Sequence, residues 1–383
     1  MSAALISGAT RQILFETGFV VCDVLGLALG AWLLWRRGPR AAGLGRDVRV
    51  ATVFGLSWVA ATALLFTALA RSFFGGIAAT VHALLFVVAP LTFLRGASRL
   101  VVARRVDGLV GVLVGCVIVG VHAWAHFVEP YRLAVDTHHI VTPHAARLPQ
   151  PVRVALLADI QTDHIGAWEE GVFARAAAAR PDLLLFAGDY VQIADRARFA
   201  VECAAFRRLI GEFRPKPRLG MFAVIGDFDP DPSIFAGTEV RLLRDETVGF
   251  DLAPKLRLCG LDLASSRSPL TADFAARTAA FDGFTIVLGH APDFAIPVIE
   301  GSISIDALLL AGHTHGGQVV IPGFGPPSTL SSVPRAVAAG GLHRYGDACL
   351  CVSRGIGMER GIAPRVRLFC PPQLLLFEIG PDS

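Results

Sequence analysis

Charged residues are scarce in this sequence. Of its 383 residues, 17% are charged and 53% are hydrophobic, whereas soluble domains average about 25% charge. A uniformly soluble enzyme is therefore not expected, and intrinsic disorder is excluded. Lysine is nearly absent, because Lys216 and Lys255 are the only two. The arginines of the C-terminal half are interspersed with acids, so no basic stripe predicts a nucleic-acid partner.

Cysteine is present but lacks a recognisable pattern. The seven cysteines fit neither the spacing of a zinc ribbon nor that of a disulfide framework. We assign them no role. One pair in the C-terminal half could form a disulfide if that half is exported, and the sequence does not choose the pair.

The apolar residues are concentrated in residues 1–130, which hold four runs of roughly 20 residues, the length that spans a bilayer. A linker is predicted over residues 131–149 and a globular domain over residues 150–383. The four predicted transmembrane α-helices are residues 18–35, 51–70, 73–94 and 108–127. Only Arg71 and Ser72 separate the second from the third, which predicts a tight hairpin. The first run lacks a basic n-region and a cleavage site, so it is not a signal peptide.

Arginines near the ends of these runs predict the orientation. The loops after the first and third runs are arginine-rich, and such loops stay in the cytoplasm. These arginines are Arg36, Arg37, Arg40, Arg46, Arg49, Arg95, Arg99, Arg104 and Arg105. We therefore predict a multi-pass protein of the bacterial cytoplasmic membrane, with the bilayer as its partner and the globular domain facing the periplasm or exterior.

Among the ionisable residues within the apolar runs, Asp23, His122 and His126 are candidates for a functional role. Asp23 is expected to pair with a hydroxyl, a histidine or an arginine of another helix, with a functional role as the alternative. His122 and His126 have the i,i+4 spacing that suits a metal. Interfacial histidines beside Trp124 are the favoured interpretation.

In the globular half, short apolar runs alternate with helical stretches at 168–179 and 199–213, which predicts an α/β fold. Five runs have the length of a buried strand: 154–158, 183–187, 221–225, 285–288 and 307–311. Further runs at 348–352, 365–369 and 374–377 make the C-terminal end strand-rich. This favours a layered sandwich over a doubly wound sheet.

Each of the five runs leads into a potential metal ligand. In order along the chain these are Asp159 with Gln161, Asp189, Asp227, His290, and His313 with His315. Sites in α/β sheets form at the carboxyl ends of strands, so we expect these side chains to meet. Mixed oxygen and imidazole ligands suit Mn, Fe or Zn. Because six strong candidates are too many for one tetrahedral ion, two divalent ions sharing a bridging carboxylate are predicted.

The order of these motifs, above all GHTHGGQ at 312–318, resembles the calcineurin-like metallophosphoesterases, in particular the bacterial membrane-associated or exported phosphohydrolases. The resemblance covers about residues 150–378. It implies a four-layer αββα sandwich. It also implies that Asp159 and His315 hold one metal, that Asp189 bridges, and that His290 and His313 hold the second.

Two motifs depart from the family pattern, at three positions in all. Gln161 stands in place of the histidine of an Asp-x-His motif, so it coordinates weakly or leaves that position vacant. Asp227 replaces an asparagine, and Phe228 replaces the histidine that contacts the phosphate and protonates the leaving group. Loss of such a general acid lowers the rate roughly 10²–10⁴-fold. His164 could substitute for it, or could be a surface residue.

These observations predict a membrane-anchored, metal-dependent phosphoesterase. A metal-activated hydroxide would attack a phosphodiester or pyrophosphate bond, with an envelope or lipid-linked molecule or another small phosphorylated molecule as substrate. The candidate catalytic residues are Asp189, Asp227 and His164. The candidate metal ligands are Asp159, Gln161, Asp189, Asp227, His290, His313 and His315. The alternative is a catalytically weakened pseudoenzyme that senses metal or phosphate. A transporter centred on Asp23 is disfavoured, because the spans carry few polar residues.

Overall fold

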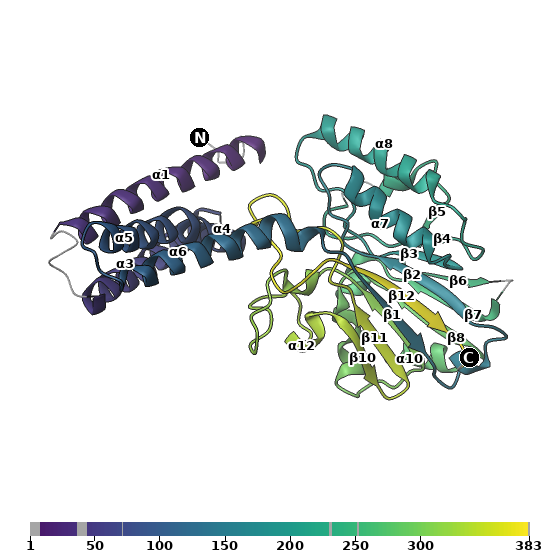
Figure 1. The fold of residues 1–383 in the computed structure, drawn as a ribbon. Coiled ribbons are helices and arrows are strands. Elements are labelled where there is room, and N and C mark those ends of the chain that lie inside the picture. The colour runs from purple at the N-terminus through teal and green to yellow at the C-terminus, as the bar shows by residue number, and fades with distance from the viewer. Residues whose placement is uncertain (1–7, 37–43, 71, 230–231, 251–252, 382–383) are drawn as a thin grey trace. The chain divides into compact units, whose positions relative to one another are not determined.

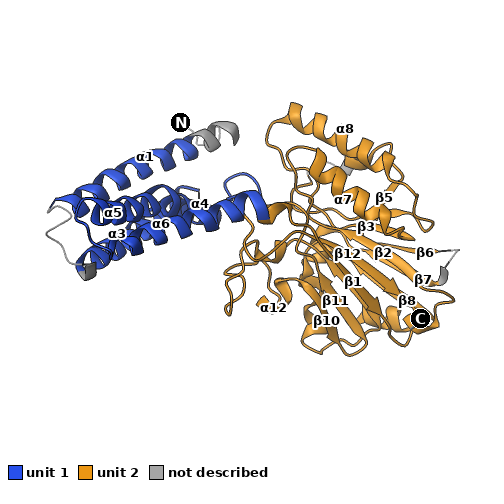
Figure 2. Cartoon of the chain, viewed as in Figure 1, with its two compact units in different colours: residues 1–128, 359–365 blue, residues 129–358, 366–383 orange. Residues whose placement is uncertain are grey.

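The computed structural model describes residues 8–36, 44–70, 72–229, 232–250 and 253–381. It divides into two compact units (Figure 2). One contains residues 1–128 together with residues 359–365, and the other contains residues 129–358 and 366–383. A short segment far along the chain therefore belongs with the N-terminal helices.

The first unit is helical and supplies the four predicted spans. Its elements are α1 (Gly8–Trp35), α3 (Leu44–Ala70), α4 (Phe73–His82), the π-helical turn η1 (Ala83–Val88), α5 (Ala89–Val101), α6 (Gly108–Ala123) and the π-helical turn η2 (Trp124–Val128). Within the described residues, four helices are long and apolar enough to cross a membrane: Leu14–Trp35, Arg46–Ala70, Phe73–Val101 and Gly108–Tyr131. The third comprises α4, η1 and α5. Pro90 lacks the N–H that would continue the α-helical pattern, which accounts for the π-helical turn before it.

Polar side chains join the helices of this unit. Asp23 on α1 meets His82 on α4, with Oδ2 and Nδ1 3.3 Å apart, which confirms the predicted interhelical pairing. Asp47 on α3 accepts hydrogen bonds from Arg95 at 3.0 Å and Arg99 at 2.9 Å. Because charges inside a helical bundle are costly unless paired, these contacts tie α3 to α5. Arg95 and Arg99 thus lie in α5, and Arg46 and Arg49 lie in α3, so the sequence-based assignment of these four arginines to loops was wrong.

In the described part of the second unit, the strands form two six-stranded sheets (Figure 1). The first has the order β1-β12-β2-β3-β4-β5, and the second has the order β10-β11-β9-β8-β7-β6. The strands of the first are β1 (Ala134–Ile140), β12 (Gln373–Ile379), β2 (Val152–Leu157), β3 (Leu183–Phe186), β4 (Met221–Ala223) and β5 (Val240–Leu242). Those of the second are β10 (Gly341–Tyr345), β11 (Ala348–Val352), β9 (Ala307–Ala311), β8 (Phe284–Leu288), β7 (Ala253–Gly260) and β6 (Glu246–Phe250).

Three buried clusters show that this unit is a four-layer αββα sandwich, as predicted. Between the sheets, Leu156 and Leu185 of the first pack with Ile286 of the second. The other face of the first sheet is covered by α7 (Ala167–Ala178) and α8 (Arg196–Glu212). That of the second is covered by α10 (Ala272–Ala279), α11 (Ile296–Ile299) and α12 (Arg335–Ala338), and the short helix α9 (Leu263–Ser266) precedes α10 along the chain. Apolar runs without alternation are the expected signature of strands that are buried on both faces.

Two sequence-based expectations fail in this unit. Residues 134–140, within the predicted linker, form β1 and pair in parallel with β12. Its alternating half-buried pattern at a sheet edge gives a weaker signal than a continuous apolar run. Residues 365–369 were expected to form a strand but do not. There the guanidinium of Arg367 is buried and donates to the carbonyl oxygens of Gly357 and Cys370.

Candidate metal centre

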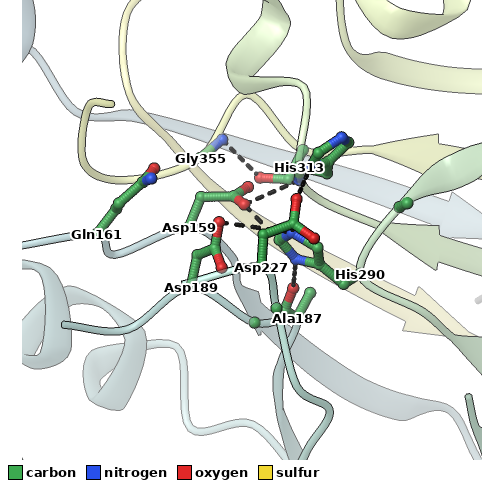
Figure 3. Close-up of polar contacts among 12 residues, drawn as sticks. Asp159, Gln161, Ala187, Asp189, Asp227, His290, His313 and Gly355 are labelled. Atoms are coloured by element: carbon green, nitrogen blue, oxygen red, sulfur yellow. Dashed lines mark hydrogen bonds and ion pairs between the residues drawn. The ribbon is translucent and has the colours of Figure 1, made fainter. Parts of the chain in front are cut away.

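Five loops at the carboxyl ends of strands carry the predicted ligands to one place (Figure 3). Asp159, Asp189 and Asp227 follow β2, β3 and β4 of the first sheet. His290 and His313 follow β8 and β9 of the second. Since β2, β3 and β4 are parallel neighbours, as are β8 and β9, each set emerges at one edge. The site is therefore built by both sheets.

Two overlapping groups of these residues have ligand atoms close enough to share an ion. One is Asp227, His290 and His313, and the other is Asp159, Asp189 and His290; within each, the atoms lie within 4.8 Å of one another. His290 Nε2 lies 3.5 Å from Asp189 Oδ2 and 3.7 Å from Asp227 Oδ2. The carboxylates and imidazoles thus converge on two adjacent positions.

Hydrogen bonds to backbone carbonyls fix how the two imidazoles face the centre. His290 Nδ1 donates to the carbonyl oxygen of Ala187 at 2.7 Å. His313 Nε2 donates to that of Leu330 at 3.3 Å. A carbonyl oxygen only accepts, so these nitrogens carry the hydrogens. The opposite nitrogen of each ring is left to ligate, an arrangement typical of metal-binding histidines.

The backbone around the ligands is strained. Asp159, Asp189 and His313 have φ values of 47°, 54° and 71°, in the left-handed region that non-glycine residues rarely adopt. Such conformations cost about 1–3 kcal/mol each and are concentrated at functional sites. At Gly226 and Gly312, an added Cβ would overlap carboxylate oxygens of Asp189 and Asp159. Only glycine lets the backbone come this close.

Backbone N–H groups orient the acids. The N–H of His313 donates to Asp159 Oδ1 at 2.8 Å, and the N–H of Phe228 donates to Asp189 Oδ1 at 2.8 Å. Asp229 was not predicted to have a role, yet it is buried and accepts from the N–H groups of Asp189, Tyr190 and Gly226 at 2.8–3.0 Å. It fixes the loops after β3 and β4 to each other. Its place beside Asp227 in the sequence was the available signal.

Burial and mutual charge govern protonation here. Burial raises the pKa of Asp159 to about 7 and also raises the pKa of Asp189. Burial alone would lower the pKa of His290, but the carboxylates of Asp189, Asp227 and Asp159 raise it to about 10. Burial opposes ionisation of Asp227 as well, yet the neighbouring imidazoles of His290 and His313 lower its pKa. Without metal, the imidazolium of His290 balances the clustered carboxylates.

The residues fit divalent metal ions. Asp159 Oδ2 and His290 Nε2 are buried and, within the described residues, neither has a hydrogen-bond partner. Buried polar atoms left in this state cost about 1–3 kcal/mol each, and metal ligation accounts for them. Carboxylate oxygen with imidazole nitrogen is the donor set of Mn, Fe or Zn rather than of Ca.

The remaining predicted residues differ in position. His315 is buried and lies near Asp159. Both residues border Gly355, because a Cβ added there would lie 3.1 Å from His315 Nδ1 and 2.9 Å from Asp159 Cβ. The amide nitrogen of buried Gln161 donates to Gln192 at 3.1 Å, which leaves its carbonyl oxygen as the only possible donor to a metal. His164 is not part of the cluster. Its side chain is 74% exposed and its Nδ1 lies 3.2 Å from Glu202, so the substitute-acid hypothesis finds no support here.

One cation at the site was missed by sequence reasoning. Arg267, directly after α9, places Nη2 2.6 Å from Asp227 Oδ1, while Asp227 Oδ2 faces His313 Nδ1 at 2.9 Å. Phe228 is 37% exposed and serves the site through its backbone. Nothing in the sequence distinguishes Arg267 from other arginines, because its segment is distant from every motif.

The chain is similar to several proteins named as phosphoesterases. The uncharacterized metallophosphoesterases YkuE and YkoQ of Bacillus subtilis are 23% and 25% identical to it over 277 and 221 residues, covering 68% and 55% of this chain and 90% and 77% of theirs. The phosphodiesterase YaeI of Escherichia coli is 34% identical over 94 residues, which are 24% of this chain and 32% of that protein. No family model matches.

Among solved structures, a dimetal phosphatase from Danio rerio is similar, with a TM-score of 0.34 and 12% identity. The likeness covers 54% of this chain and 88% of that one.

Proposed function

We propose that this chain, which is similar to proteins named metallophosphoesterases and a phosphodiesterase, is a calcineurin-like metallophosphoesterase. It would hydrolyse phosphodiester or pyrophosphate bonds of a lipid-linked or other phosphorylated envelope molecule. The observation that carries this proposal is the pair of ligand groups that share His290. Two adjacent ion positions suit a phosphate, whose oxygens can be held from both sides.

Each residue of the centre has a part in this reaction. Asp159, Asp189, Asp227, His290 and His313 would hold two divalent ions, which supply Lewis acidity toward the phosphate and an attacking water. Hydrogen bonds would keep these ligands in place during turnover. They fix the rings of His290 and His313, and backbone N–H groups hold the carboxylates of Asp159 and Asp189. This preorganisation lowers the reorganisation needed in the transition state.

Arg267 is the residue that we propose to hold the phosphate. Its Nη2 is engaged with Asp227 Oδ1, and a guanidinium has five N–H donors in a planar fork. The side chain is 51% exposed, so the other donors can meet a substrate that enters from solvent. A fixed cation here stabilises charge on the phosphate oxygens but donates no proton to a leaving group.

The absence of an imidazole at Phe228 favours particular substrates. An alkoxide needs protonation as it leaves, whereas a phosphate or another acidic group does not. His164 pairs with Glu202 on the surface, so it does not fill this role. Pyrophosphates and diesters with acidic leaving groups are therefore the preferred substrate class.

Hydrolysis of bis-p-nitrophenyl phosphate by the detergent-solubilised full chain with Mn²⁺ tests the proposal, because nitrophenolate leaves without a proton. We expect turnover in the wild type, loss of it in Asp189→Asn, and retention of it in Asp195→Asn. The control Asp195 is an exposed N-cap that accepts from Arg198 N at 2.8 Å, and asparagine caps equally well. Stoichiometric bound metal without turnover would support the pseudoenzyme alternative instead.

The location is also part of the proposal. The four apolar helices would anchor the protein in the bacterial cytoplasmic membrane, with the metal centre on the periplasmic or outer side, because Arg36, Arg104 and Arg105 follow the first and third spans. Fusions after Pro130 test this. Alkaline phosphatase should be active there and green fluorescent protein dark, and the reverse result would place the centre in the cytoplasm.

A further inference from the structure

A cavity of about 480 Å³ lies within the helical unit. Its walls come from α1, α4, η1, the end of the fourth span and the segment 361–365. All of these belong to the same compact unit, and Figure 2 colours residues 359–365 with the helices. The volume is within the range of about 300–1,000 Å³ typical of ligand sites.

The walls combine aromatic and polar side chains. Phe15, Phe19, Phe86 and Phe127 supply apolar surface, and the Phe19 ring stacks on His82 with centroids 4.5 Å apart. The apolar part of the cavity thus offers a surface that an acyl chain can cover.

The polar lining consists mainly of nitrogen groups. His82, His122, His126 and Arg365 all line the cavity. The rings of His122 and His126 have centroids 4.1 Å apart, and His126 Nδ1 donates to the carbonyl oxygen of His122 at 3.2 Å. Glu16 also lines the cavity and acts against an anion. Ionisable groups at membrane depth are costly, which makes a functional role the default expectation.

We propose that this cavity binds the phosphate headgroup of a membrane phospholipid, with Arg365 and the imidazoles on the phosphate and the phenylalanines along the start of the acyl chains. The planar guanidinium fork can bind phosphate through two parallel hydrogen bonds. The helices place the cavity where lipids are the abundant ligand. A metal is a poorer occupant, because the groups of described residues close enough to share an ion do not include these histidines.

The site differs from the metal centre but is joined to it along the chain. The N–H of Gly357 donates to the carbonyl oxygen of Asp159 at 2.8 Å, and only Met358, Glu359 and Arg360 separate Gly357 from Gly361. On the other side, Arg367 donates to the carbonyl oxygen of Gly357 at 3.0 Å. A bound lipid would therefore contact the segment that is anchored at both ends beside Asp159.

Binding of dioctanoyl phosphatidic acid to the full chain in a neutral detergent tests the proposal and requires no catalysis. We expect phosphatidic acid to bind at least about tenfold more tightly than dioctanoylglycerol, which lacks only the phosphate, since hydrogen bonds to charged groups have this magnitude. Inorganic phosphate should compete weakly. Equal binding of the two lipids would overturn the proposal, as would competition by free phosphate at the affinity of the lipid.

Variants locate the site. Arg365→Gln should lose about tenfold in affinity, and Arg36→Gln should stay within about twofold. Arg36 belongs to the same unit and lies over the Trp32 ring, 4.7 Å from its centroid, outside the cavity.

Crosslinking of a diazirine-bearing phosphatidic acid to the wild type gives a result that does not depend on variant folding. Labels on residues 122–127 or 361–365 support the proposal, and labels confined to other segments overturn it.

Discussion

Replacement of Arg267 by alanine tests whether a cation outside the metal ligands binds the substrate phosphate. Arg267 Nη2 lies 2.6 Å from Asp227 Oδ1, and the side chain is half exposed. Because an exposed ion pair contributes at most about 1 kcal/mol to stability, the variant should fold normally. A hydrogen bond from a charged donor is worth about 1.5–3 kcal/mol, which predicts a fall in kcat/KM of about 10–150-fold.

The assay is hydrolysis of bis-p-nitrophenyl phosphate with Mn²⁺, with kcat and KM measured separately. Arg267→Lys should give an intermediate value, because lysine keeps the charge but not the planar fork. Arg244→Ala is the matched control, since Arg244 is 56% exposed and pairs with Asp262 at 3.3 Å. An Arg267→Ala enzyme within about twofold of the wild type, or an equal loss in Arg244→Ala, would refute the reasoning.

Three further predictions concern the same centre. Phe228→His should raise the rate on alkyl phosphodiesters by up to about 10²–10⁴-fold while leaving nitrophenyl ester hydrolysis nearly unchanged; a uniform effect on both substrates would contradict the general-acid argument. Gly312→Ala should weaken metal binding by more than about tenfold, because the new Cβ overlaps Asp159 Oδ2, and calorimetry that finds wild-type affinity would show that the loop can relax. Since the pKa of His290 is raised to about 10 and that of Asp159 to about 7, metal binding at pH 8 should displace a proton from His290 and at pH 6 from both. Affinity should thus fall as the pH drops, and calorimetry in buffers of different ionisation enthalpy that detects no proton release would contradict these values.

Protonation of His290 affects the stability of the metal-free fold in the opposite direction to its effect on metal affinity. A histidine whose folded pKa rises from 6.5 to about 10 stabilises the metal-free fold fully below pH 6.5. That stabilisation is lost as the pH rises through 10. Proton competition therefore favours the metal-free state at low pH.

The strands that carry ligands could be predicted from the sequence because their runs are buried on both faces. Val154 and Leu156 face the space between the sheets, while Ala155 and Leu157 face the helices. Such an apolar run is continuous in the sequence, and it ends shortly before the polar ligand residue. β1 lies at the edge of a sheet, and its residues alternate in exposure. The search for continuous apolar runs therefore missed this strand and predicted a linker there.

The site residues divide in the same way. Asp159, Asp189 and His290 lie two or three residues beyond the ends of β2, β3 and β8, and parallel pairing within each sheet brings the ends of its strands to one edge. Arg267 reaches Asp227 from the end of a four-residue helix, and no local pattern encodes that contact. His164 is near Asp159 in sequence, but its pairing with Glu202 on α8 holds it at the surface. Proximity along the chain was a poor guide where tertiary contacts orient the side chain.

Electron paramagnetic resonance of the Mn²⁺-loaded full chain, combined with metal quantification, tests the two-ion centre most directly. Ions about 3.5–4 Å apart are magnetically coupled. The wild type and Asp195→Asn should each bind two Mn²⁺ with a coupled spectrum, and Asp189→Asn should lose the coupling. A single uncoupled ion in the wild type, or a coupled pair that survives Asp189→Asn, would contradict the proposed two-ion centre. Its ligands are Asp159, Asp189, Asp227, His290 and His313.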